Sequence, residues 1–131
     1  MSVIPSVAAG LSQLQALANF LDTGSSNATF SFYNDSKPSS VTVAANPSAR
    51  LVTLSLPKPC FKALNADNIE LYPTDAATVT KTGTATWVRL FNGNGDAVAD
   101  FTVGTDITLA NPNLVLGSTL MINSIKLRPT T

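Results

Sequence analysis

Three polar residues in one short segment have the spacing of the first ligands of a calcium loop. Asn92, Asn94 and Asp96 stand two residues apart, and each could offer a side-chain oxygen to a hard cation. The match then fails, because Ala97 stands where such a loop needs its glycine and Val103 where it needs its bidentate glutamate. The two Asn-Gly pairs in this segment favour a hairpin turn with positive φ angles. We therefore interpret the segment as a turn and expect no metal and no cofactor.

The single cysteine could act as a nucleophile. Cys60 lies between Lys58 and Lys62, whose positive charges would lower the pKa of its thiol and favour the thiolate. A cysteine nucleophile also needs a base, and because the chain has no histidine, only a lysine or a carboxylate could serve. A lone cysteine in a chain with few charges is typical of a buried structural residue, and we adopt that interpretation.

Three nearby carboxylates could supply the acid and base of a glycoside hydrolase. Asp96, Asp100 and Asp106 lie within one short stretch of the chain. Asp96 falls in the turn and Asp106 just before a strand, which are common positions for aspartate. Asp100 alternates with apolar neighbours, so we expect it to point to solvent or to cap a neighbouring strand. We expect the chain not to be an enzyme.

The one tryptophan could belong to a binding platform. Trp87 and Arg89 fall on the same face of an expected strand and could stack against a sugar or a peptide. The alternative is a core tryptophan with an arginine reaching the sheet edge. We favour the core, because the chain has one tryptophan and two tyrosines.

The composition excludes several classes of protein. Charged residues make up 12% of the 131 residues and the formal net charge is zero, so a phosphate-binding basic surface is not expected. One cysteine cannot form an internal disulfide, and no apolar run approaches the ~20 residues of a membrane helix. The first residues lack the basic and apolar regions of a signal peptide. A near-zero charge favours association with other chains.

One amphipathic helix is expected near the N-terminus, over Val7–Leu21. Its apolar residues recur at three- and four-residue spacing, Ser6 is a suitable N-cap, and Gly24 a suitable exit. The helix carries no charged residue. Its outer face could therefore be an ordinary Ser/Gln/Asn surface, or it could be covered by another subunit; both interpretations remain open.

Short alternating segments follow the helix at intervals near ten residues, which is typical of a β-sandwich or barrel. We expect residues 60–68 to be a connector, and residues 84–91 to be a central strand because large apolar side chains occupy both of its faces. The fold class is mainly β: a β-sandwich or jelly-roll-like single domain spanning 1–131, with an N-terminal arm and helix (1–24) and the sandwich (25–131). The expected strands are 28–33, 41–43, 50–56, 69–72, 78–80, 84–91, 97–103, 107–109, 114–116 and 119–127.

Several of these segments resemble a family of small virion structural proteins of tailed bacteriophages and prophages. The shared positions are turns and core residues, so no functional residue carries over. The resemblance implies a head decoration, or cement, protein. It extends over residues 27–33 with Pro38, residues 51–54 with Pro59 and Phe61, residues 82–89 with Gly95, residues 100–104, Gly117 and residues 122–125.

The expected function is therefore contact with other protein chains within a virion, after synthesis in the host cytoplasm without a secretion signal. The partners would be the major capsid protein, copies of this chain in a homo-oligomer, or both, with no nucleic acid and no membrane. The alternatives are a tail or fibre component and a carbohydrate-binding β-sandwich for host attachment. The candidate contact residues are Ile4, Pro5, Leu11, Leu14, Leu127 and Arg128.

Overall fold

A computed structural model describes residues 3–129 of the chain. These residues form a mainly β fold with one α-helix near the N-terminus, which confirms the predicted class. The elements are α1 (Val7–Leu21), β1 (Thr29–Tyr33), the 3-10 helix η1 (Pro47–Ala49), β2 (Arg50–Ser55), β3 (Phe61–Leu64), β4 (Ile69–Leu71), β5 (Ala77–Thr78), β6 (Gly83–Thr84), β7 (Trp87–Phe91), β8 (Ala97–Thr102), β9 (Asn113–Leu114), β10 (Thr119–Leu120) and β11 (Ile125–Leu127).

Helix α1 begins and ends where the local signals predict. The Ser6 hydroxyl accepts a hydrogen bond from the backbone N–H of Ala9 at 3.2 Å, which satisfies one of the free donors of the first turn. Asp22 ends the helix, and Gly24 turns the chain away with a φ of +108°. Only glycine adopts this left-handed conformation without strain, so the exit depends on Gly24.

The largest sheet has four antiparallel strands in the order β2-β1-β7-β8. β7 lies inside this sheet, and its first four residues are buried, which confirms a central strand over residues 87–91. The expected strand 84–91 is too long, because Thr84 belongs to β6, which pairs with β9 in another sheet. Side chains alternate between the two faces of a strand. Val88 and Leu90 accordingly join the main core, while Trp87 joins a small second core with Tyr33 on the other face.

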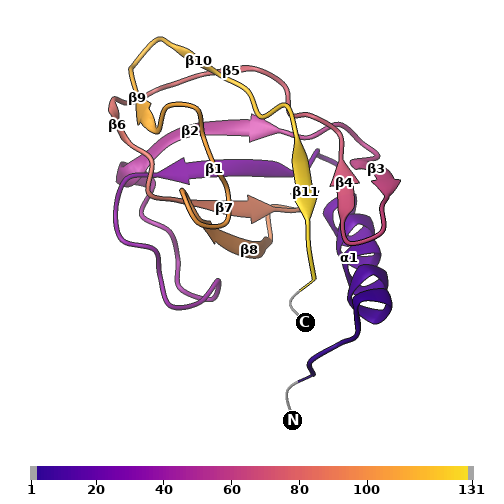
Figure 1. The fold of residues 1–131 in the computed structure, drawn as a ribbon. Coiled ribbons are helices and arrows are strands. Elements are labelled where there is room, and N and C mark those ends of the chain that lie inside the picture. The colour runs from indigo at the N-terminus through magenta and orange to yellow at the C-terminus, as the bar shows by residue number, and fades with distance from the viewer. Residues whose placement is uncertain (1–2, 130–131) are drawn as a thin grey trace.

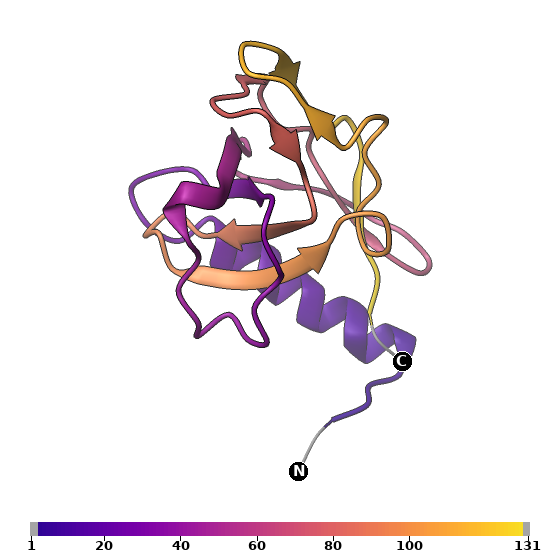
Figure 2. The same cartoon turned by 90° about the vertical axis from the view of Figure 1, so that its left-hand side faces the viewer.

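The main core lies between this sheet, helix α1 and a three-stranded sheet in the order β11-β4-β3. Figure 1 shows β4 and β11 running across the direction of β1 and β7, with α1 beside β3 and β4. Two more strand pairs, β5 with β10 and β6 with β9, lie at the end of the molecule away from both termini (Figures 1 and 2). The sheets surround one core as in a sandwich that is not closed.

Two of the expected elements are wrong, each for a different reason. At residues 41–43, local hydrogen bonds to Ser40 override strand propensity. Residues 41–43 form a turn, in which the backbone N–H of Val43 donates to the Ser40 carbonyl at 3.1 Å and Thr42 donates to the Ser40 hydroxyl at 3.2 Å. The expected connector 60–68 instead contains β3, which pairs with β4. Pairing between such short strands depends on contacts with distant segments and leaves little local signal.

The expected strand over residues 119–127 is also interrupted. Ile122 exchanges two hydrogen bonds with Thr74: its N–H donates to the Thr74 hydroxyl and its carbonyl accepts from the Thr74 N–H, both at 3.0 Å. The chain thereby leaves β10, which pairs with β5, and enters β11, which pairs with β4. Of residues 107–109, only Ile107 makes a β-bridge.

Candidate functional site

The densest polar cluster in the described residues surrounds Arg89, on the face of the large sheet opposite the main core. Its guanidinium forms a bidentate pair with Asp100 on the neighbouring strand β8, at 2.7 Å from Nε and 3.0 Å from Nη2. Nη1 donates to the carbonyl of Val43 at 2.7 Å, and Nη2 donates to that of Ser40 at 3.4 Å. The guanidinium also lies 5.2 Å from the centre of the Trp87 ring. Every bond of this arginine therefore goes to the protein itself.

The charges in this cluster are buried and compensate each other. The side chains of Arg89 and Asp100 are only 3% and 6% exposed. The hydrogen bonds that Arg89 donates to Asp100 raise the pKa of Arg89, so the guanidinium remains charged. The expectation that Asp100 points to solvent or caps another strand is wrong, because it is the counter-ion of a buried arginine. The pair holds the loop around Ser40 and Val43 against the sheet.

Trp87 is a core residue, which confirms the interpretation favoured from the sequence. It is fully buried, its ring stacks on that of Tyr33 with centroids 4.4 Å apart, and its Nε1–H donates to the Asp35 carboxylate at 2.7 Å. Burial raises the pKa of Tyr33, which favours its neutral form. A ring covered in this way offers no stacking surface to a sugar.

The segment with calcium-loop spacing is a hairpin turn. The side-chain oxygen of Asn92 accepts hydrogen bonds from the backbone N–H groups of Asn94 and Asp96, both at 3.0 Å. This oxygen is therefore used by the turn itself. Within residues 3–129, no group of three or more histidine, cysteine or acidic residues is placed to hold a metal ion.

The three aspartates are not brought together as a catalytic pair. Asp96 precedes β8 and Asp106 follows it; the six residues of β8 extend about 20 Å at ~3.3 Å each. Asp106 bonds the backbone N–H of Thr102 at 2.9 Å, and Asp100 is held by Arg89. The two carboxylates of a glycosidase lie about 5–9.5 Å apart, so Asp96 and Asp106 are too distant.

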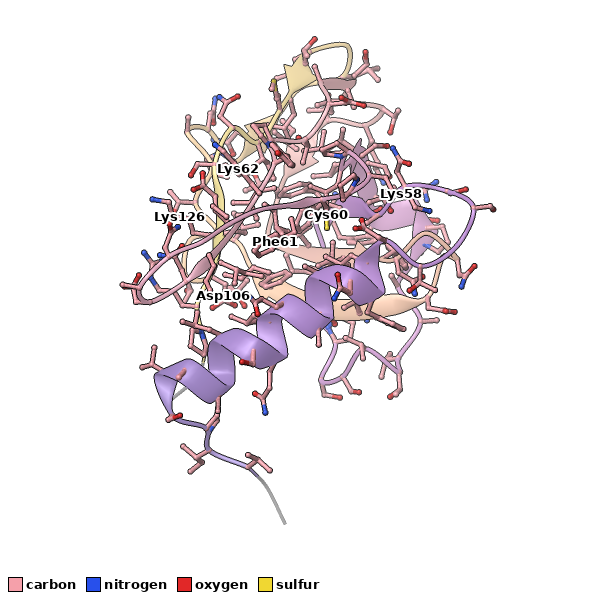
Figure 3. All side chains as sticks on the ribbon, turned by 90° about the vertical axis from the view of Figure 1, so that its right-hand side faces the viewer. Lys58, Cys60, Phe61, Lys62, Asp106 and Lys126 are labelled. Carbon is pink, nitrogen blue, oxygen red and sulfur yellow. The ribbon has the colours of Figure 1, made fainter. Side chains whose placement is uncertain are left out.

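Cys60 is a buried structural residue, as expected. It is fully buried in the main core, its thiol donates to the Ala18 carbonyl of α1 at 3.5 Å, and its backbone N–H donates to Asp22 at 3.1 Å. Burial, with the nearby Asp22 carboxylate, raises the pKa of Cys60 to about 12. Figure 3 shows Lys58 and Lys62 on either side of Cys60, where both are exposed and do not activate the thiol.

We expect the folded protein to resist thiol reagents at pH 8 and to react after unfolding. Its stability should also fall as the pH rises from about 9 towards 12, because the unfolded chain loses the thiol proton first and the folded chain holds it. A colorimetric thiol titration in buffer and in urea measures the first effect. The slope of unfolding free energy with pH, compared with that of Cys60→Ala, measures the second. Rapid modification of the folded protein would contradict the assignment.

The structure places the six expected contact residues in three different environments. Ile4 is 82% exposed and Arg128 is exposed beside Asp67 at 3.9 Å, while Pro5 is half-buried. Leu14 and Leu127 are partly buried and pack against the main core. Leu11 belongs to that core, with 9% of its surface exposed. Because its helix face covers the chain's own sheets, Leu11 is corrected from a contact residue to a core residue.

Six of the ten exposed large hydrophobic residues described fall into two groups, and the other four are Phe20, Val43, Leu64 and Tyr72. We call Val3, Ile4 and Val7 the arm patch; they are 71%, 82% and 43% exposed. We call a second group the loop patch, which the sequence analysis missed: Val115, Leu116 and Met121, at 58%, 63% and 45%. The sequence predicts a strand over residues 114–116, but β9 ends at Leu114 and the next two residues lie in a loop. Figures 1 and 2 show β9 and β10 at the opposite end from the termini and the start of α1.

Both patches lie in long uncharged stretches of the chain. No charged residue occurs from Met1 to Leu21, nor between Asp106 and Lys126. Comparison of the chain with models of protein families, with curated proteins and with solved structures finds no match. Among residues 3–129, no helix has the length and apolar character needed to cross a membrane.

Proposed function

We propose that this protein is a phage virion structural protein, a head decoration protein that stabilises the capsid through protein–protein contacts and not through catalysis. The observation that carries the proposal is the pair of exposed apolar patches at opposite ends of one β domain. A protein that bridges neighbouring subunits needs two separate contact surfaces. The cores of protein interfaces are depleted in charged residues, as are the two stretches of chain that carry these patches.

The buried polar groups support a structural role as well. Four of the chemical candidates of the sequence, Arg89, Asp100, Trp87 and Cys60, are bonded or packed within the fold. The stabilising mechanism would be mass action: a protein that binds the assembled shell and not its separated subunits stabilises the shell by RT ln(1 + [L]/Kd). The loop patch would contact the major capsid protein.

The copy number of this chain in purified particles tests the proposal, by quantitative mass spectrometry against the major capsid subunit. Decoration predicts a simple ratio to that subunit. A few copies per particle would overturn decoration and favour the tail or fibre alternative, whereas absence from particles would overturn a virion role altogether.

Charge placed in the loop patch should reduce binding to the shell. Leu116→Asp introduces a carboxylate where the proposal expects an apolar contact, so we expect at least about tenfold weaker binding to particles stripped of this chain. Ser36→Asp adds the same charge to an exposed loop and is the matched control. Equal binding by both variants would show that the loop patch does not face the capsid.

A further inference from the structure

A groove of about 510 Å³ runs between helix α1, strand β8 and the C-terminal segment. Its apolar lining comes from Leu14 and Leu17 of the helix, Ala99 and Phe101 of β8, and Leu127 of β11. Figure 3 shows Asp106 and Lys126 beside α1 on this side of the molecule. Three consecutive residues of β8, residues 99–101, line the groove, which therefore reaches the edge of the strand and not only one of its faces.

This edge of the large sheet is open. The backbone N–H of Val103 donates to Thr86 at 3.0 Å, so Phe101 and Val103 bond towards β7 while Asp100 and Thr102 point their backbone groups outwards. Asp106 bonds both backbone groups of Thr102: its N–H donates to the Thr102 carbonyl, and its carboxylate accepts from the Thr102 N–H. Within residues 3–129, β8 pairs only with β7, so Asp100 presents a backbone donor and acceptor to the groove. Such an edge is a template for an added strand.

The N-terminal arm has the complementary character. Residues 3–6 precede the helix without regular structure, and Val3 and Ile4 are the two most exposed large hydrophobic residues described. Burying both side chains on association would remove their apolar surface from water, which favours the contact. The arm is uncharged. Its valine and isoleucine would contact the leucines of the groove, whose remaining lining includes Asp100, Asp106, Lys126 and Arg128.

Arm and groove adjoin each other on the same face. A Cβ atom at Gly10 would overlap the ring of Pro129 and lie 3.5 Å from Cγ of Pro5, so the base of the arm and the C-terminal segment meet over the start of α1 (Figure 2). Arg128, the residue before Pro129, lines the groove. A twofold axis near Gly10 could thus carry each arm into the groove of the other copy, and a twofold interface closes with both surfaces used.

We propose that two copies of this chain exchange arms, with residues 3–5 of each adding an edge strand to β8 in the groove of the other. This inference deepens the proposed function and rests on it for its biological role: the arm patch would join two copies, leaving both loop patches for the capsid. An exchange limited to two short arms and the adjoining helix surface is smaller than a standard stable interface, so the dimer is expected to form reversibly.

Sedimentation equilibrium of the full chain over a wide concentration range tests the association. Ile4→Ser should raise the dimer dissociation constant about tenfold, because serine cannot make the apolar contact of isoleucine with the leucines of the groove and adds no charge beside Lys126 and Arg128. Leu116→Ser carries a matching change at the loop patch and should leave the dimer unchanged. Ile4 is exposed in the single chain, so circular dichroism should show both variants folded. A monomer at all concentrations, or equal effects of both variants, would overturn the exchange.

Disulfide trapping locates the arm. A mixture of Ile4→Cys and Ala99→Cys chains should give a cross-linked heterodimer on mild oxidation, whereas Ile4→Cys with Val115→Cys should not. Equal yields from both mixtures would overturn the placement of the arm on β8. The two proposals fail separately: a monomer that is still abundant in particles overturns only the exchange, and a trapped dimer that is absent from particles overturns only the virion role.

Discussion

Replacing Asp100 by alanine should lower the free energy of unfolding by about 3–5 kcal/mol, the range for removing one partner of a buried ion pair. The Arg89 guanidinium would keep its bonds to the Val43 and Ser40 carbonyls but would lose both bonds to the carboxylate. An uncompensated charge would then remain in a site from which water is excluded, because the arginine side chain is 3% exposed. Urea unfolding followed by circular dichroism measures the loss.

The chain offers a matched exposed pair as the control. Lys62 and Glu70 lie 3.4 Å apart with 45% and 22% of their side chains exposed, and removing an exposed ion pair typically changes stability by less than about 1 kcal/mol. Glu70→Ala should therefore lose much less than Asp100→Ala. The double variant Arg89→Met with Asp100→Leu should recover part of the loss, since it removes both charges. A loss below about 1 kcal/mol for Asp100→Ala would contradict the importance of the pair.

This ion pair also marks where sequence reasoning stops. The turn at residues 92–96 predicts the hairpin, and a regular ladder counted back from the pair of Phe91 with Ala97 would set Arg89 opposite Ala99. A β-bulge between Leu90 and Phe91 shifts the register by one residue, so that Arg89 pairs with Asp100. A one-residue shift moves a side chain to the other face of the sheet. The register shift leaves no signal in the sequence. Alternation with apolar neighbours predicted an exposed Asp100, because it does not show that the loop around Ser40 and Val43 covers this face of the sheet.

Helix α1 could be predicted to the residue because its signals are local. The Ser6 cap, the spacing of the apolar residues and the Gly24 exit all act within a few residues of each other. What covers its outer face is not local. The structure buries Leu11, Ala18 and Leu21 in the main core, and Gly10 faces Pro129. The outer face of the helix is uncharged and lies at the surface. Whether another subunit covers it is a question that the association experiments address.

The contact surface was predictable only in part. An exposed aliphatic residue and a buried one look the same in sequence when both belong to apolar stretches, as Leu114 and Leu116 do. Their difference comes from Ser118, which donates to the Val115 carbonyl at 2.9 Å, closing a turn that ends β9 and turns the chain back towards β10. The loop patch therefore emerges from tertiary structure and not from periodicity.

Gly93→Ala should lower the free energy of unfolding by about 3 kcal/mol, at the upper end of the range for overpacking. The two Asn-Gly pairs suggested that both glycines supply positive φ angles, but only Gly95 does, at +83°. Gly93 is needed for space: a Cβ there would overlap the carbonyl oxygen of Ser26 and lie 2.5 Å from that of Thr23. These obstacles are backbone atoms and cannot rotate away. Urea unfolding measures the loss.

Gly93 joins the hairpin turn to the end of α1, so a shift of the backbone here would disturb both elements. Its N–H donates to the Leu21 carbonyl at 3.3 Å, and its own carbonyl accepts from the Ser26 N–H at 3.2 Å. Gly95→Ala is the matched control, because a Cβ there meets nothing within 4 Å and only the left-handed backbone is strained, by about 1–2 kcal/mol. If Gly93→Ala proved no more destabilising than Gly95→Ala, the helix end and the turn would not be packed as closely as the structure requires.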